Sequence, residues 1–173
     1  FIEHVHVTNI LRSTTKKFQV WYQPIWDPNQ QTFSSAEALI RMQDFTGNYI
    51  PPDKFIPIAE ELGIIDDIFW FVLENSCKLL NQHPELPLKS ISLNMALPQF
   101  ENPHLLNKML EIINRYHLTP AQFKLEITER ILSDDHIKVK ELIQQMHLAG
   151  FCFCLDDFGT GYSNQANIIR YPY

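Results

Sequence analysis

The sequence predicts an α/β fold in which helices cover a parallel β-sheet. Short runs rich in β-branched and aromatic residues alternate with longer amphipathic segments, which is the pattern of strand–helix–strand units. The 173 residues are 45% hydrophobic and 20% charged, a composition and a length sufficient to bury one sizeable core. We therefore expect one domain over residues 18–173, preceded over residues 1–17 by a linker or an N-terminal helix.

The predicted strands are short apolar runs, and the predicted helices are the longer segments between them. The strands are expected at residues 18–25, 36–42, 90–95, 123–128 and 151–156. Pro51 and Pro52 begin the first helix, which Gly63 can end. Three further helices are expected at residues 66–82, 103–116 and 133–148, the last with Ser133 as N-cap and Gly150 beyond its end.

Acidic and amide side chains stand near the ends of the predicted strands. Asn94 and Asp156 end their strands and Glu126 lies late in the strand between them, at intervals of 32 and 30 residues, close to the roughly 30 or more residues of one strand–helix–strand unit. Glu37 and Arg41 lie on the second strand, with their side chains on the same face. Because ligands bind where the carboxyl ends of parallel strands converge, we expect these side chains to share one site.

The expected site is rich in oxygen donors. A hard cation such as Mg²⁺ or Mn²⁺ prefers the carboxylate and amide oxygens that these side chains supply. Asp157 follows Asp156 directly and can reach a second cation, and two metals about 3.5–4 Å apart would clamp both oxygens of a phosphate displacement. A single acid at a strand end is usually a solvated group or a helix cap. Its repetition on successive strands favours a metal-dependent phosphodiester hydrolase, because burying unpaired carboxylates is costly.

The charge balance disfavours a nucleic-acid polymer as a partner. The chain has 14 basic and 20 acidic residues and a net charge of -6, whereas binding a nucleic-acid backbone needs clustered Lys and Arg. The longest apolar stretch, residues 64–73, contains Asp66 and Asp67 and is too short to span a bilayer. The three cysteines cannot all pair and are expected to be reduced core residues. Together these features favour a cytoplasmic location.

Several aromatic residues allow two interpretations. Aromatic side chains can form a platform on which bases stack, or they can pack in a core or along a helix face. We expect the second arrangement for Trp21, Phe69, Trp70 and Phe71.

Six ordered motifs carry a family resemblance. They are Tyr22-Gln23-Pro24-Ile25, Glu37-Ala38-Leu39-Ile40-Arg41, Phe55-Ile56-Pro57-Ile58-Ala59-Glu60, Ser92-Leu93-Asn94, Leu125-Glu126-Ile127-Thr128-Glu129 and the run from Asp156 to Ser163. In this order and at these separations they resemble the EAL-domain family of cyclic-di-GMP phosphodiesterases, from about residue 18 to residue 173. The Glu-Ala-Leu string alone would carry no weight.

The resemblance implies a TIM-type (β/α)8 barrel, of which this chain holds about the first five strands and their helices. It implies hydrolysis of cyclic di-GMP to linear pGpG with two Mg²⁺ or Mn²⁺ ions, in bacterial second-messenger signalling. By the same resemblance, Asp156 and Asp157 are the catalytic pair, acting through the metals, and Glu129 steadies the loop that follows them. The substrate ligands would be Gln23, Leu39 and Arg41, and the metal ligands Glu37, Asn94, Glu126, Asp156 and Asp157.

The chain also departs from the family pattern. It stops at Tyr173, before the lysine-bearing sixth strand and the later glutamate of the family, so no residue here takes those two roles. We expect little or no activity from the chain alone, and a homodimer or strand exchange to cover the open sheet edges. Residues 1–17 are compatible with a linker from an upstream cyclase or sensor domain. Two alternatives stay open: a catalytically inactive cyclic-di-GMP receptor or signalling module, and an inactive truncated fragment.

Overall fold

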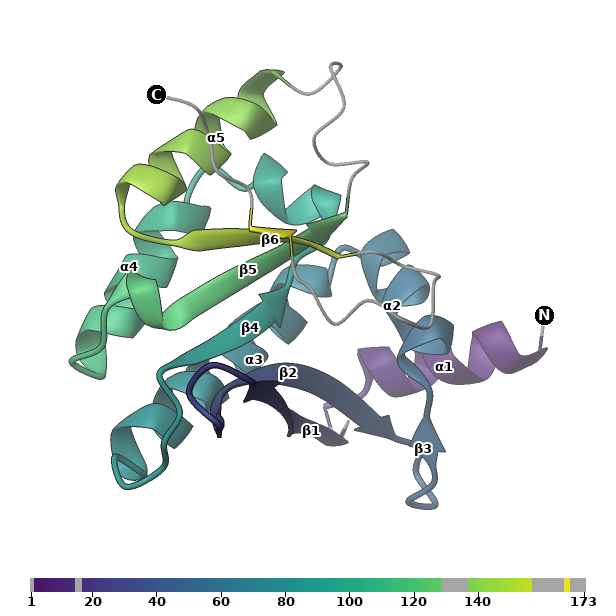
Figure 1. Ribbon diagram of the computed structural model, residues 1–173. Coiled ribbons are helices and arrows are strands. Elements are labelled where there is room, and N and C mark those ends of the chain that lie inside the picture. The colour runs from purple at the N-terminus through teal and green to yellow at the C-terminus, as the bar shows by residue number, and fades with distance from the viewer. Residues whose placement is uncertain (1, 15–16, 129–136, 157–166, 169–173) are drawn as a thin grey trace.

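The computed structural model describes residues 2–14, 17–128, 137–156 and 167–168, and its strands form a single sheet (Figure 1). Over the described residues the strand order is β1-β2-β4-β5-β6-β7, with β3 paired to the C-terminal end of β2. The bounds are β1 (Lys17–Asp27), β2 (Thr32–Gln43), β3 (Tyr49–Ile50), β4 (Ser90–Asn94), β5 (Phe123–Thr128), β6 (Cys152–Asp156) and β7 (Asn167–Ile168).

Helices separate β3, β4, β5 and β6 along the chain, as the sequence predicts. The helices expected at residues 51–63, 66–82 and 103–116 are present, and the described part of the fourth begins at residue 137. None of the described helices is long and apolar enough to cross a membrane. Their bounds are α1 (Ile2–Arg12), α2 (Pro52–Glu61), α3 (Ile65–Gln82), α4 (Leu105–Arg115) and α5 (Ile137–Leu148), with the 3-10 turns η1 (Leu97–Glu101) and η2 (Pro120–Gln122).

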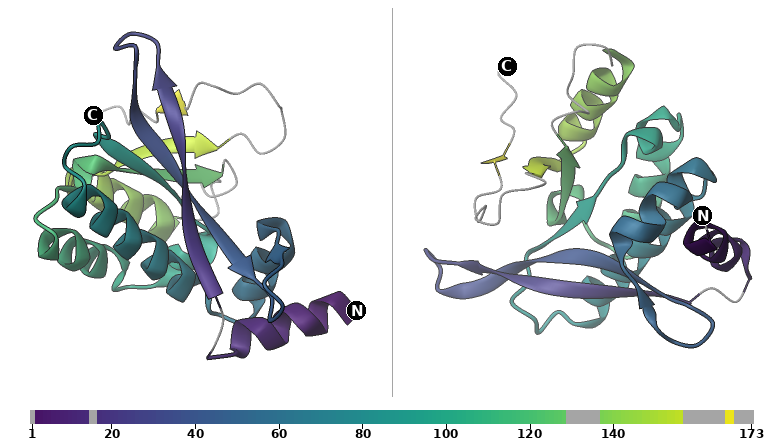
Figure 2. Two further views of the ribbon diagram at one scale, coloured as in Figure 1. Left: turned by 90° about the horizontal axis from the view of Figure 1, so that it is seen from below. Right: turned by 90° about the vertical axis from the view of Figure 1, so that its right-hand side faces the viewer.

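The directions of the strands differ from the expectation of a fully parallel sheet. β2, β4, β5 and β6 are parallel, but β1 pairs antiparallel with β2 and β7 antiparallel with β6. Residues 28–31, which join β1 to β2, are too few for the crossover that a parallel pair requires. Asp27 Oδ1 accepts hydrogen bonds from the backbone N–H groups of Asn29 and Gln30 and tightens this turn. The hairpin is a long twisted ribbon whose tip projects past the neighbouring strands (Figure 2).

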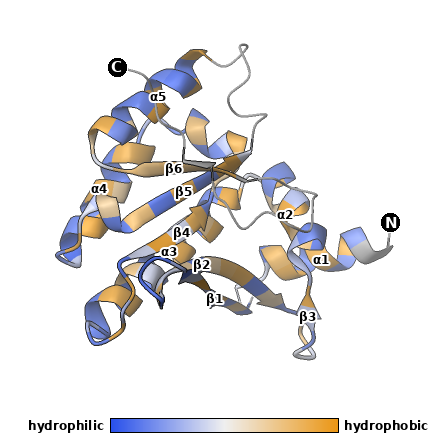
Figure 3. Cartoon of the chain, viewed as in Figure 1, coloured by the Kyte–Doolittle hydropathy of each residue, from blue (hydrophilic) through white to orange (hydrophobic). Residues whose placement is uncertain are grey.

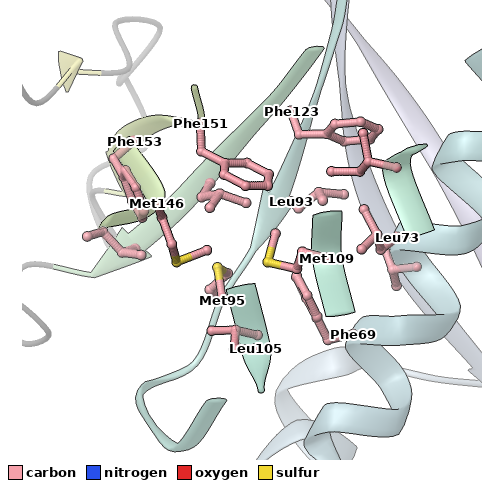
Figure 4. Packing of buried hydrophobic residues seen from close by; sticks show 14 of the residues in the cluster. Phe69, Leu73, Leu93, Met95, Leu105, Met109, Phe123, Met146, Phe151 and Phe153 are labelled. Atoms are coloured by element: carbon pink, nitrogen blue, oxygen red, sulfur yellow. The ribbon is translucent and has the colours of Figure 1, made fainter. Parts of the chain in front are cut away.

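The main core lies between the parallel strands and helices α3, α4 and α5. The helices carry apolar and polar residues on different sides (Figure 3), and the apolar sides meet the side chains of β4, β5 and β6. Figure 4 shows this packing. Burial of these side chains fixes the strands in register and therefore fixes the depth at which each strand ends. The largest fully buried side chains of the main core include Leu73, Leu93, Leu105, Met109, Phe123, Phe151 and Phe153.

A second apolar cluster includes the N-terminal helix. We expected residues 1–17 to lie outside the core, but Val7, Ile10 and Leu11 are buried against a group that includes Met42 and Phe55. The cause is the spacing of the three residues, which places them on one face of α1. Thus α1 packs against α2 as part of the described structure, and the boundary expected between residues 17 and 18 stays a prediction.

Candidate metal and substrate site

The parallel pairing of β2, β4 and β5 brings three of the expected site residues together. Asn94, the last residue of β4, is in register with Glu126 on β5. Its Nδ2 donates a hydrogen bond to Oε1 of Glu37 on β2, at 2.9 Å. The backbone N–H of Met95 donates to the carbonyl oxygen of Glu126, at 2.9 Å, and holds the residue after Asn94 against β5. Two carboxylates and one amide therefore lie side by side on three neighbouring strands, toward the C-terminal ends of β4 and β5.

These residues line a cavity of about 770 Å³. Leu39 and Arg41 of β2 lie in its wall together with the three polar residues, while α2, α3 and the segment after β4 supply most of the remaining surface. The wall is largely apolar, which is the usual composition of a small-molecule site with a few convergent polar groups. The other residues in the wall include Pro52, Ile56, Glu60, Ile65, Ile68, Phe69, Val72, Met95, Leu97, Gln99 and Thr128.

Gln23 and Arg41 occupy different positions relative to the cavity. Gln23 on β1 is the register partner of Glu37, so the two side chains share a face of the sheet, but Gln23 is exposed and is not part of the cavity wall. Arg41 is half-buried in the wall, and its Nη1 donates to the carbonyl oxygen of Ile40 at 2.9 Å. Its guanidinium carbon lies 5.1 Å from the centre of the Trp21 ring.

The remaining expected site residues lie at or beyond the limit of the description. Asp156 ends β6, and its backbone pairs in register with Thr128 of β5. The register partner of Glu126 is Cys154, so Asp156 lies two residues further toward the C-terminal end of β6. The side chain of Asp156, and all of Asp157 and Glu129, lie outside the described residues. In the described part of the chain, no three His, Cys, Asp or Glu side chains gather as a metal-binding group. The described donors of the expected site are two carboxylates and an amide.

Sequence reasoning missed Gln99, which stands in the cavity wall. Its side chain is only 2% exposed, and its Oε1 accepts a hydrogen bond from the backbone N–H of Ala96 at 2.6 Å. Its Nε2 is buried without a hydrogen-bond partner among the described residues. The side chain thus fixes the backbone two residues after Asn94. The sequence offers only the spacing of three residues from Ala96 as a signal, and that spacing is common to many turns.

We expected Trp21, Phe69, Trp70 and Phe71 to pack in the core or along a helix face. This is correct for the three residues of α3 and wrong for Trp21 of β1. Phe69 is buried in the main core, while Trp70 and Phe71 are partly buried on α3. Trp21 is neither in the core nor on a helix: it lies on β1 and is 47% exposed. The alternation of β1 directs Tyr22 toward Ser76 of α3 and its neighbour Trp21 to the opposite face.

A comparison with known protein families agrees with the order, spacing and placement of these motifs. The family described as "EAL domain" matches residues 8–173. The chain belongs to the EAL-domain family. Among curated relatives, this EAL domain is 31% identical over 157 residues to the signaling protein YkoW of Bacillus subtilis, covering 90% of the chain and 20% of YkoW. It is 34% identical over 149 residues to the probable cyclic di-GMP phosphodiesterase PdeB of Escherichia coli, covering 84% of the chain and 28% of PdeB.

Solved structures confirm the fold class of the EAL domain. The PaMucR phosphodiesterase in complex with c-di-GMP has 30% identity and a TM-score of 0.74, over 84% of this chain and 60% of PaMucR. The cAMP-bound form of the EAL enzyme Bd1971 has 28% identity and a TM-score of 0.78, over 94% of this chain and 47% of Bd1971. The described α/β structure is therefore part of an EAL-type barrel. The chain spans between 19% and 28% of the length of the first curated relatives that it matches.

Proposed function

We propose that this EAL domain carries part of the site with which a bacterial signalling protein hydrolyses cyclic di-GMP to linear pGpG. The observation that carries the proposal is the convergence of Glu37, Asn94 and Glu126 in one cavity, with Arg41 in the same wall. The names of PdeB and PaMucR, which the chain resembles at 34% and 30% identity, agree with this activity.

The residues present fit a Mg²⁺ or Mn²⁺ ion. Hard cations bind carboxylate and amide oxygens, and the described donors are of this type without an imidazole or thiolate among them. Asn94 donates through Nδ2 to Glu37, so its amide keeps the carbonyl oxygen Oδ1 as an acceptor. When bound, such ions neutralise the charge on a phosphate and lower the pKa of water. We propose Glu37, Asn94, Glu126 and Asp156 for the first ion, and Asp156 with Asp157 for the second.

Each substrate contact follows from the chemistry of one side chain. The Arg41 guanidinium suits a phosphate oxygen, because its planar donors match that geometry. Leu39 offers an apolar contact to a base, and the exposed amide of Gln23 can donate and accept hydrogen bonds at the rim. The apolar wall from α2 and α3 lowers the dielectric constant on its side of the cavity and thereby strengthens the polar contacts.

Local positive charge is needed because the chain as a whole repels anions. Its net charge is -6, so the dinucleotide would approach against the overall potential unless metal ions and Arg41 reverse it at the site. We assign Glu129 the role of steadying the loop after the Asp156–Asp157 pair. We also propose a cytoplasmic location, an upstream cyclase or sensor domain, and association as a homodimer or by strand exchange.

An assay with a matched pair of variants tests the function. The longest natural form of the protein is incubated with cyclic di-GMP and either Mg²⁺ or Mn²⁺, and linear pGpG is followed by chromatography. Glu37→Ala should abolish turnover, whereas Glu111→Ala, an exposed residue of α4, should leave it unchanged. Tight binding of cyclic di-GMP without any turnover in the unmodified protein would instead assign the chain to a receptor. No binding and no turnover would refute both.

A further inference from the structure

Trp21 is an exposed indole on the face of β1 that adjoins the site. It is 47% exposed, although it lies within a paired strand. Its register partner is Leu39, and the Arg41 guanidinium carbon lies 5.1 Å from the centre of its ring. Leu39 and Arg41 both line the cavity. Trp21 therefore flanks the cavity at the side where its wall is formed by β2.

The orientation of the indole is fixed by its neighbours. Trp21 Nε1 donates a hydrogen bond to Oε1 of Gln19 at 3.2 Å, and the hydroxyl of Tyr49 donates to the same oxygen at 2.9 Å. The rings of Trp21 and Tyr49 pack 5.2 Å apart at 72°. An apolar surface that is already ordered before a ligand arrives loses little conformational entropy on binding. This arrangement is that of a prepared contact surface rather than of a loose side chain.

A second tryptophan on the same strand lacks these features. Trp26 is 50% exposed, but it follows the irregularity between Ile25 and Trp26 and pairs in register with Phe33. The two rings pack 5.1 Å apart, and Phe33, unlike the Trp21 partner Leu39, is not part of the cavity wall. Exposure on β1 alone therefore does not distinguish Trp21. Its distinguishing features are its contact with Arg41 and its pairing with Leu39.

We propose that Trp21 is a stacking surface for one guanine base of the cyclic dinucleotide, a proposal that rests on the function proposed above. An indole face attracts a purine ring by stacking, and the neighbouring guanidinium suits the phosphate attached to that nucleoside. Stacking on an aromatic side chain commonly strengthens binding of one base by about tenfold or more. Trp21 thus sets the affinity for the base, while the carboxylates and Asn94 act at the phosphate.

Steady-state kinetics on the longest natural form separate these roles. Trp21→Ala should raise the KM for cyclic di-GMP by about tenfold or more and change kcat little, because the contact is made with a part of the substrate remote from the reacting bond. Trp21→Phe keeps an aromatic face and should stay within about threefold of the unmodified protein. Trp26→Ala is the matched control and should behave as the unmodified protein. Mn²⁺ affinity should be the same in all four proteins.

Fluorescence supplies a readout that a purely structural role would not produce. Saturating cyclic di-GMP should quench a component of the tryptophan emission that is absent from Trp21→Phe. A raised KM without such quenching would show that Trp21 acts only by orienting Arg41, and would overturn the stacking proposal. An unchanged KM in Trp21→Ala would also overturn it and leave the proposed function intact. If the unmodified protein neither binds nor cleaves cyclic di-GMP, the proposed function fails, and this inference fails with it.

Discussion

The side chain of Asn94 donates a hydrogen bond to the Glu37 carboxylate over 2.9 Å, although the two residues are 57 positions apart in the sequence. The bond joins the middle of β2 to the last residue of its parallel neighbour β4. It also sets the orientation of the amide, because the nitrogen faces Glu37 and the oxygen is left for another interaction. The contact therefore ties β2 to β4 beside Glu126, the register partner of Asn94.

Replacing Asn94 with Asp tests this relationship. The variant loses the donor and places a second carboxylate against Glu37, so without metal its Tm should fall by about 2–4 °C, the effect of roughly 1 kcal/mol at this chain length. Excess Mn²⁺ should close the gap, because a cation bound between the two acids stabilises the folded state by mass action. Thermal unfolding in EDTA and in Mn²⁺ measures both effects.

The matched control for this prediction is Asn114→Asp, an exposed position on α4. Its Tm should respond to Mn²⁺ as that of the unmodified protein does. A Tm difference between Asn94→Asp and the unmodified protein that persists in Mn²⁺ would contradict a cation site at Asn94.

The central strand of the sheet should be sensitive to cavities. Leu125 on β5 has no exposed surface and pairs in register with Leu93 and Phe153. Leu125→Ala should lower the free energy of unfolding by about 2–5 kcal/mol. Leu148→Ala, at a position that is 79% exposed, should change it by no more than about 0.5 kcal/mol. Denaturant unfolding measures both values, and equal losses would show that the burial assigned to β5 is wrong.

The thiol of Cys77 should be inert in the folded protein. Burial, with a smaller contribution from the Glu74 carboxylate, raises the pKa of Cys77 to about 12. Only the thiolate reacts with alkylating reagents, and at pH 8 this group stays protonated. Iodoacetamide at pH 8 should therefore leave Cys77 unmodified in the native protein and label it after denaturation, as judged by peptide mass mapping. Rapid labelling of native Cys77 would contradict its place in the core.

The turn between β2 and β3 should make stability depend on acid pH. A hydrogen bond from the Thr46 hydroxyl, with further bonds from the backbone of Thr46 and from Asn48, lowers the pKa of Asp44 from 3.8 to about 2. A depressed pKa stabilises the fold above the unfolded value, and this stabilisation is lost as the pH falls through the folded value. The difference in free energy of unfolding between the unmodified protein and Asp44→Asn should thus be constant above about pH 4 and shrink between about pH 4 and 2.

Chemical denaturation at several pH values measures that difference. Thr46→Val removes the largest of the stabilising hydrogen bonds and should weaken the pH dependence. A difference between the unmodified protein and Asp44→Asn that stays constant down to pH 2 would refute the assignment.

Sequence patterns predicted the helices better than the strand directions. Proline entries, apolar spacing and terminal glycines are local signals, and they placed α2, α3 and α4 within a few residues of their bounds. The antiparallel pairing of β1 with β2 follows from the short connection at residues 28–31, a feature that the alternation of strand and helix patterns does not contain. The apolar spacing of Val7, Ile10 and Leu11 was likewise available as a sign that α1 packs into the structure.

The positions of the polar residues in the site were easier to predict from the sequence than those of the other residues in or beside the cavity wall. Asn94 and Glu126 lie late in short strands, and this depth can be counted along the sequence, whereas Glu37 lies in the middle of the longer β2 and meets them through the parallel register of β2 with β4. Their role as metal ligands stays a prediction. The exposure of Trp21 and the buried amide of Gln99 depend on which face of a strand or turn is covered, and that is decided by packing between distant segments.

Metal removal tests the central claim most directly. The longest natural form is stripped with EDTA, and hydrolysis of cyclic di-GMP is followed as Mg²⁺ or Mn²⁺ is restored, beside Glu126→Gln. We predict no pGpG in EDTA, recovery on adding metal to the unmodified protein, and a rate more than about a hundredfold lower in Glu126→Gln, since even changes around metal ligands commonly cost 10–100-fold. Hydrolysis that continues in EDTA, or that is undiminished in Glu126→Gln, would contradict a metal-dependent site at this edge of the sheet.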